Sequence, residues 1–322
     1  MSLYKLDNKL LDTVALPRRR RRKNDGLTIK PLTNVIFNIL VGAFAISAII
    51  PFLMVVSISF TEESAISKYG YRLFHTDFSL KAYEYVFSAS DQIYRSFFVS
   101  VVVTVLGTIL CLFMTSSYAY PLYRRTFPFK KFLSLYNFFT MMFSGGLVPT
   151  YLVMTQLLHL KNTIWALIIG GALNSFWVFI MRTFYSTTIP ESLIDSAMID
   201  GCTEFKIYYK IVLPISLPAL ATLGLFTAVG YWNSWFEALL YIEKAELVPL
   251  QYMLMQIERN IQYLIDNAHT LDTQQLEYMR ANLPAQSVRN AITVIVVLPI
   301  ALSYPFFQKY FIRGITIGAV KG

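Results

Sequence analysis

Charged residues are missing from long parts of this 322-residue chain, although it contains 28 lysines and arginines and 19 aspartates and glutamates. No Asp, Glu, Lys or Arg occurs in six windows, at residues 36–56, 97–117, 133–153, 163–181, 216–236 and 291–308. Each window is about long enough to cross the hydrocarbon core of a bilayer as a helix. Since 55% of the residues are hydrophobic, the composition argues against an ordinary soluble domain. We predict an all-α, polytopic membrane protein with six transmembrane helices.

The groups that covalent chemistry requires are also scarce. Two cysteines, Cys111 and Cys202, and three scattered histidines are too few for a metal site, and we expect no disulfide. No ionisable residue lies inside a window, which disfavours proton coupling. No G-x-x-x-x-G-K-[ST] phosphate loop occurs, so ATP hydrolysis would belong to another polypeptide. A membrane enzyme acting on glycans stays open as an alternative, although it would need convergent titratable groups.

The loops on the two sides of these windows differ in charge. Residues 1–35, 118–132, 182–215 and 309–322 contain 19 Lys and Arg against 7 Asp and Glu, whereas the opposite loops contain 9 against 12. The positive-inside rule therefore places the first set, with both termini, in the cytoplasm. The basic run at residues 18–23 is then an orientation anchor beside membrane lipid rather than a nucleic-acid site.

A polar, amphipathic stretch interrupts the apolar chain at residues 188–214. Thr188 and Glu191 have the spacing of a capping box, and Pro190 would fall in the first turn of the helix. Leu193, Ile194, Ala197 and Met198 recur on one face of that helix.

The same stretch contains a predicted hinge at Asp200 and Gly201. Gly201 is suited to end the first helix in the left-handed conformation, and Thr203 to cap a second one. Pro214 is predicted to end the element. An amphipathic pair of helices of this kind suits recognition by a partner protein, and a helix lying on the membrane surface is the alternative.

Aromatic and amide side chains gather where the fifth window ends. Aromatic rings can stack on sugars while an amide bonds their hydroxyls, but Trp and Tyr also form the ordinary interfacial belt of membrane proteins. An amide turned toward lipid would lack hydrogen-bond partners, so we expect Asn233, and Asn174 in the fourth window, to face a neighbouring helix or a cavity. The candidate pathway residues are Asn174, Tyr231, Trp232, Asn233 and Trp235.

The 188–214 stretch resembles the cytoplasmic coupling loop of ABC-importer permeases. In that family E-A-A, three residues, Gly and nine further residues precede I-x-L-P. Here D-S-A-M-I-D-G at 195–201 is followed after nine residues by Ile211, Leu213 and Pro214, so Asp195 and Ser196 replace Glu and Ala. Outside this loop, W-N-S-W-F at 232–236 and P-L-Q-Y at 249–252 resemble permeases of the maltose-importer type, most of all the branch serving complex or polysaccharide-derived sugars.

This resemblance implies the six-helix fold of a type I ABC importer permease in the prokaryotic cell membrane. We divide the chain into a basic segment (1–32), a transmembrane domain (33–313) with a coupling loop (188–214) and an extracellular loop (242–287), and a cytoplasmic tail (314–322). The implied partners are a second homologous permease, two ATP-binding subunits that hold ATP and Mg, an extracellular solute-binding protein and an oligosaccharide. The expected ATPase-coupling residues are Asp195, Ser196, Ala197, Asp200, Gly201, Ile211, Leu213 and Pro214. A permease for a non-sugar solute remains the other interpretation.

Overall fold

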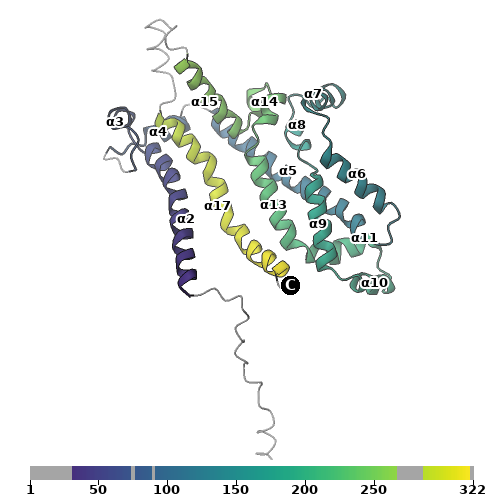
Figure 1. Ribbon diagram of the computed structural model, residues 1–322. Helices are drawn as coiled ribbons and strands as arrows, with labels where there is room; N and C mark the ends of the chain where they lie inside the picture. The colour runs from purple at the N-terminus through teal and green to yellow at the C-terminus, as the bar shows by residue number, and fades with distance from the viewer. Residues whose placement is uncertain (1–30, 74–76, 89–90, 267–285, 320–322) are drawn as a thin grey trace, which may run out of the picture. The chain divides into compact units, whose positions relative to one another are not determined.

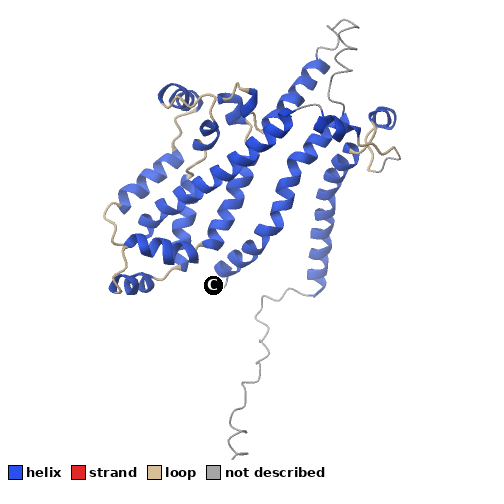
Figure 2. Cartoon of the chain, turned by 180° about the vertical axis from the view of Figure 1, so that it is seen from behind, coloured by secondary structure: helices blue, strands red, loops and turns tan. Residues whose placement is uncertain are grey.

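The computed structural model describes residues 31–73, 77–88, 91–266 and 286–319. Helices joined by loops make up the described residues, whose only β pairing is an isolated bridge between Thr61 and Phe78 (Figure 2). The helices are α2 (Pro31–Ser59), α3 (Glu63–Tyr69), α4 (Lys81–Ser88), α5 (Asp91–Tyr123), α6 (Lys130–Met142), α7 (Leu147–Leu152), α8 (Ile164–Ile169), α9 (Ser175–Thr188), α10 (Glu191–Ile199), α11 (Glu204–Ile207), α12 (Leu213–Ile215), α13 (Leu217–Trp232), α14 (Phe236–Tyr241), α15 (Leu250–Asp266) and α17 (Gln286–Ala319). Two π-helical turns, η1 (Val153–Leu157) and η2 (Tyr208–Val212), and a 3-10 turn, η3 (Ala245–Leu247), complete them.

The chain divides into two units, residues 1–53 and 54–322. The described part of the first unit belongs to α2, and nearly all of its apolar side chains are exposed. A helix that is apolar all round fits a lipid environment rather than water. The predicted basic segment at residues 1–32 lies almost wholly outside the described residues.

The second unit is built around α5, a helix of 33 residues. It contacts α13, α9, α8, α15 and α6, and α13 in turn contacts α17 (Figure 1). Gly107 of α5 leaves room for the ring of Tyr231 on α13, because a Cβ at Gly107 would lie 2.6 Å from that ring. Close approach of this kind between helices is typical of membrane proteins.

Some predicted transmembrane spans are single helices in the structure, and others are pairs of shorter helices. Three described helices are long and apolar enough to cross a membrane: Pro31–Ser59, Asp91–Tyr123 and Gln286–Ser303. Two bent pairs bring the number to five if each is one span, Lys130–Met142 with Leu147–Leu157 at 111° and Glu204–Ile215 with Leu217–Trp232 at 75°. The fourth window, 163–181, is divided between α8 and α9. The count of six therefore stays a prediction.

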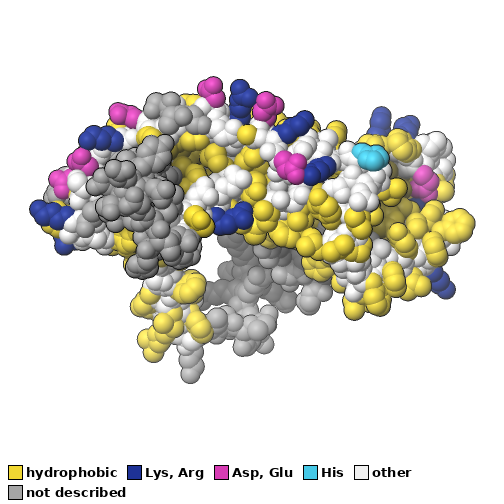
Figure 3. Space-filling model, turned by 90° about the horizontal axis from the view of Figure 1, so that it is seen from above, with side chains coloured by type: hydrophobic (Ala, Val, Ile, Leu, Met, Phe, Trp, Pro, Cys, Tyr) yellow, Lys and Arg dark blue, Asp and Glu magenta, His cyan; other side chains and the backbone are white. Residues whose placement is uncertain are grey.

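The two ends of the second unit carry different elements. One end has α4, α14 and α15, and acidic and basic side chains are interspersed there (Figure 3). Three ion pairs belong to this end: Lys81–Glu62, Arg95–Glu246 and Lys161–Glu243. In the last pair, the hydrogen bond from Lys161 holds the pKa of Glu243 below its ordinary value, and the same bond raises the pKa of Lys161. The opposite end carries α10 and α11 (Figure 1).

Candidate functional site

The predicted pair of short helices in the 188–214 stretch is confirmed as α10 and α11. Gly201 has φ +76°, and the Cys202 N–H donates to the Ala197 carbonyl at 2.9 Å, which ends α10 in the left-handed geometry expected of a glycine. The Thr203 hydroxyl accepts from the Lys206 N–H at 3.4 Å and caps α11. The hinge and the second cap are therefore as predicted.

The predicted start of α10 is wrong. Thr188 is the last residue of α9, and Pro190 is the N-cap of α10 without a side-chain hydrogen bond. The reason is that α9 extends to the last position that Pro190 permits. Ile189, which precedes the proline, is extended, as proline sterics favour.

The predicted stop at Pro214 is also corrected. Leu213 and Pro214 lie inside α12, which follows η2 directly, so the helical chain continues through the proline. The direction of the chain changes two residues later, with a 75° bend between Ile215 and Leu217. Pro214 lies just after the π-helical turn η2, where the regular ladder of helical hydrogen bonds is already interrupted, so its missing N–H is tolerated there.

Three side chains, Tyr120, Arg124 and Glu204, attach α11 to the end of α5, and we call them the α5 clamp. The Arg124 side chain is 6% exposed, and its Nη2 and Nε donate to Glu204 Oε1 at 2.8 and 3.1 Å. The Tyr120 hydroxyl donates to the other oxygen of the same carboxylate. A second ion pair joins Arg125 to Glu191 of α10 at 2.7 Å, but the Arg125 side chain is 82% exposed. The clamp is therefore the stronger attachment, because water screens it less.

Buried hydroxyl contacts add to this attachment. The Ser116 and Tyr208 hydroxyls share a hydrogen bond of 2.7 Å, and the Tyr185 hydroxyl donates to the Ser116 carbonyl at 3.3 Å. The Tyr123 hydroxyl donates to the Ile189 carbonyl at 2.9 Å. These bonds tie η2, α9 and the α9–α10 connection to one stretch of α5.

Around the hinge, α10 and α11 also carry exposed residues, and we call this set the coupling face. It consists of Asp195, Ser196, Ile199, Asp200, Gly201 and Phe205. Ile199 and Phe205 are 87% and 72% exposed, so a large, exposed apolar side chain lies on each side of the polar hinge in the sequence. Neither residue was among the predicted coupling residues, although the sequence places Phe205 on the second helix; the available signal was their apolar character on either side of the polar hinge.

The remaining predicted coupling residues lie elsewhere. Ala197 is 7% exposed and, with Ile194, packs inside the chain's own core against α5 and α9. Ile211 and Leu213 are half-buried, and Pro214 is exposed at the bend. The predicted apolar face of α10 is thus divided, since Ile194 and Ala197 face inward.

A polar cavity of about 210 Å³ lies where α9, α13 and α14 meet, and we call it the α13–α14 cavity. Its lining includes Asn174, Trp177, Tyr231, Ser234 and Glu237. The Ser234 hydroxyl donates to the Glu237 carboxylate. Asn174 Oδ1 caps α9 by accepting from two backbone N–H groups at 2.9 and 3.3 Å, while its amide nitrogen makes no hydrogen bond within the described chain.

The candidate pathway residues are only partly brought together. Of the five, Asn174 and Tyr231 line the α13–α14 cavity, and Trp232, Asn233 and Trp235 do not. Asn233 is exposed and Trp235 is half-buried. The cavity instead adds Trp177, Ser234 and Glu237, which were not among the predicted pathway residues.

Tyr231 and Trp232 have clear packing roles. The Tyr231 hydroxyl donates to the Ile168 carbonyl at 2.7 Å, and its ring lies between Gly107 and Gly171. Trp232 Nε1 donates to the Val296 carbonyl of α17 at 2.9 Å, and its ring meets the edge of Phe97 at 5.9 Å. Both side chains hold α13 against its neighbours, and a part in solute passage remains a prediction for them.

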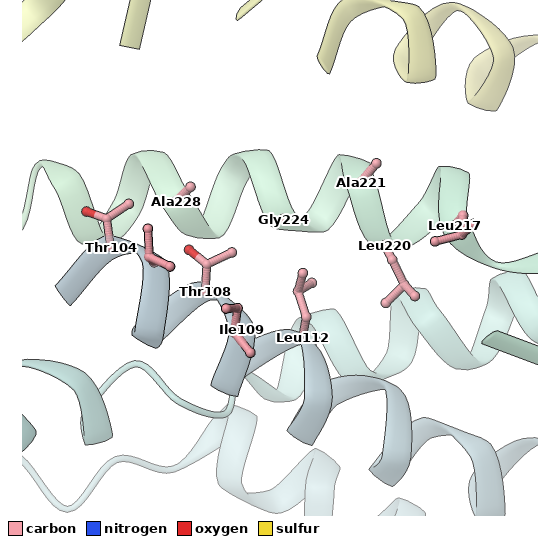
Figure 4. Close-up of a pocket in the computed structure, with 10 residues that line it drawn as sticks. Thr104, Thr108, Ile109, Leu112, Leu217, Leu220, Ala221, Gly224 and Ala228 are labelled. Atoms are coloured by element: carbon pink, nitrogen blue, oxygen red, sulfur yellow. The ribbon is translucent and has the colours of Figure 1, made fainter. Parts of the chain in front are cut away.

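A larger groove of about 620 Å³ lies between α5 and α13. Figure 4 shows Thr104, Thr108 and Leu112 of α5 beside Leu220 and Gly224 of α13. Its lining is almost wholly apolar, so it offers few hydrogen-bonding groups to a polar solute. The α13–α14 cavity is therefore the better candidate for solute contact.

Comparison with known proteins identifies the class to which this architecture belongs. Residues 119–317 match the family described as binding-protein-dependent transport system inner membrane component. The chain belongs to this family of ABC-transporter permeases, and it is therefore a transport subunit rather than an enzyme.

Two relatives and one solved structure are similar to this chain over most of its length. The polygalacturonan/rhamnogalacturonan transport system permease protein YtcP of Bacillus subtilis is 41% identical over 296 residues, covering 90% of this chain and 100% of the relative. Protein LplC of the same organism is 41% identical over 289 residues, covering 90% and 94%. Among solved structures, a bacterial ABC transporter involved in import of the acidic polysaccharide alginate has a chain that matches with a TM-score of 0.74 and 26% identity, covering 87% of this chain and 96% of that one.

Proposed function

We propose that this chain forms half of the translocation pathway of an ATP-driven importer of oligosaccharides. The sugar class is supported by relatives whose names specify polygalacturonan, rhamnogalacturonan and alginate. A second, homologous permease would supply the other half, and an extracellular solute-binding protein would deliver the sugar. The chain itself would perform no covalent chemistry, and ATP and Mg would be held by two separate ATPase subunits.

The observation that carries this proposal is the coupling face. The exposed side chains of Ile199 and Phe205 can bind an apolar groove of a partner protein. The exposed carboxylates of Asp195 and Asp200 add negative charge to the same segment. Because the α5 clamp holds this face to α5, movement of an ATPase against it would be passed to the membrane helices and would switch the pathway between its two access states. Ala197 would then support α10 from inside rather than touch the ATPase.

The proposed membrane topology follows the distribution of Lys and Arg among the loops. In this proposal the chain crosses the prokaryotic cell membrane six times, and α8 and α9 together form the fourth crossing. The loops rich in Lys and Arg, the coupling face, both termini and the tail at residues 314–322 would lie in the cytoplasm. The 242–287 loop, of which residues 267–285 are outside the described chain, would meet the extracellular side.

Uptake by the complete importer, reconstituted in proteoliposomes with its solute-binding protein, tests the proposal. Gly201→Asp should abolish uptake and leave docking of the solute-binding protein unchanged, because it places a further carboxylate beside Asp200 on the coupling face. Gly201→Asn is the matched control, since Asn and Asp are similar in size and both tolerate positive φ better than other side chains. Normal uptake by correctly inserted Gly201→Asp would refute the coupling role.

A further inference from the structure

The α13–α14 cavity has an unbalanced charge. Glu237 contributes a carboxylate, and the described residues that line the cavity include no lysine or arginine. The other polar groups of this lining, from Cys111, Asn174, Trp177, Thr227, Tyr231 and Ser234, supply no positive charge. Within the described part of the chain, an anionic solute group that enters this space therefore meets a like charge without a compensating cation.

The rest of the lining suits a neutral sugar ring. Trp177 stacks on Phe226 with ring centroids 5.9 Å apart and 23° between their planes, which forms an aromatic wall. The amide nitrogen of Asn174 makes no hydrogen bond among the described residues, so it can donate to a hydroxyl. With about 210 Å³, the cavity holds one ring at a time rather than a whole oligosaccharide.

A structural role for Glu237 also exists. It lies in the first turn of α14, where a carboxylate stabilises the unpaired N–H groups, and it accepts the Ser234 hydroxyl. These contacts fix the position of the carboxylate, and neither of them supplies a cationic side chain. A purely structural role predicts equal effects on all sugars, whereas an electrostatic role distinguishes sugars by charge.

We propose, on the basis of the sugar-importer function above, that Glu237 is a specificity-determining residue that makes this cavity select neutral sugar residues against uronic acid residues. The carboxylate accepts hydroxyl hydrogen bonds from a neutral ring and repels the C6 carboxylate of a uronic acid. If the complete importer carries acidic oligosaccharides, the cations that bind them must come from the partner permease or from another part of the pathway.

Equilibrium dialysis tests this with the complete importer in nanodiscs, without ATP. The two labelled probes are a galactose disaccharide and the galacturonic acid disaccharide of the same linkage, which differ only at C6. Glu237→Gln should raise the affinity for the acidic probe about tenfold, which corresponds to about 1.4 kcal/mol, and change the neutral affinity far less. Salt should reduce this difference between wild type and the variant.

Glu243→Gln is the matched control, because Glu243 is an exposed carboxylate paired with Lys161 outside the cavity. It should leave the ratio of the two affinities unchanged. An unchanged ratio in Glu237→Gln, or equal weakening of both probes, would overturn the proposal. Failure of wild type to bind either probe would overturn it too, and uptake in proteoliposomes would then show separately whether the sugar-importer function survives.

Discussion

Two turns in the second unit, the α10–α11 hinge and the α13–α14 turn, are attached to neighbouring helices by different kinds of interaction. The α10–α11 hinge is attached to α5 by charges and hydroxyls, with Arg124 and Glu204 at its centre, and it presents exposed apolar side chains. The α13–α14 turn is attached by close packing, with the Tyr231 ring between Gly107 and Gly171, and it presents a polar cavity.

The difference matches what each turn has to contact. An exposed apolar face stabilises association with a protein, whereas a polar cavity suits a hydrated solute. The attachments differ for a related reason. The ion pair of the α5 clamp keeps α11 attached to α5 when α11 is displaced, whereas a ring between two glycines tolerates little movement. We therefore expect the hinge to transmit force and the α13–α14 turn to keep its shape.

The largest effect should come from breaking the hinge attachment. Glu204→Ala leaves Arg124, with its side chain 6% exposed, without a carboxylate and removes the acceptor of the Tyr120 hydroxyl. We expect a loss of about 2 to 3 kcal/mol of stability, below the range for a fully buried pair because Glu204 is 48% exposed. ATP-driven uptake should be lost while docking of the solute-binding protein persists. Uptake and thermal unfolding of the purified importer measure the two effects.

Arg125→Ala is the control for this prediction. It removes the ion pair to Glu191, but the Arg125 side chain is 82% exposed, so the cost should stay within about 1 kcal/mol. If the two variants unfold at the same temperature and transport equally well, the clamp does not hold the coupling face, and the contrast between the two turns disappears.

A smaller effect should come from adding one methyl group beside Tyr231. In Gly107→Ala the new Cβ would lie 2.6 Å from the ring, and the bond to the Ile168 carbonyl prevents the ring from moving freely. We expect a loss of about 2 kcal/mol from overpacking, against the usual gain in helix propensity. Thermal unfolding of the assembled importer measures it.

Gly170→Ala is the matched glycine variant. No atom of the described residues lies within 4 Å of a Cβ at Gly170, so this change should be neutral or slightly stabilising. Tyr231→Leu in the Gly107→Ala background should recover part of the lost stability. Equal stability of the two glycine variants would show that the ring is not confined.

The features of the α10–α11 hinge that could be predicted are those that depend only on residues close together in the sequence. Gly201 and Thr203 act on backbone groups within four residues of themselves, so their roles could be inferred from spacing alone. The predicted role of Thr188 was wrong because it also rested on local spacing alone. Thr188 could cap α10 by its spacing, but it belongs to the last turn of α9. No local rule decides between two helices that both include the same residue.

The α13–α14 turn depends on partners far along the chain. Trp232 bonds a carbonyl 64 residues away, and such a partner has no trace in the local pattern. Glu237 was missed because the windows were defined by the absence of charge, and it lies one residue beyond the fifth. In the fourth window, the cap that Asn174 supplies to α9 explains why the helix is divided there.

The smallest effect tests whether Trp232 belongs to the packing or to the pathway. Trp232→Phe keeps an aromatic ring and removes the N–H that donates to the Val296 carbonyl, which should cost about 1 kcal/mol. Trp235→Phe is the comparison: Trp235 is only partly buried against the core, and its indole N–H makes no hydrogen bond with the described residues, so its stability should change less. Thermal unfolding and the ratio of neutral to acidic sugar binding are measured together. A packing role requires that Trp232→Phe lower the unfolding temperature at a constant ratio. A changed ratio at constant stability would instead place Trp232 in contact with the sugar and move the pathway toward α17.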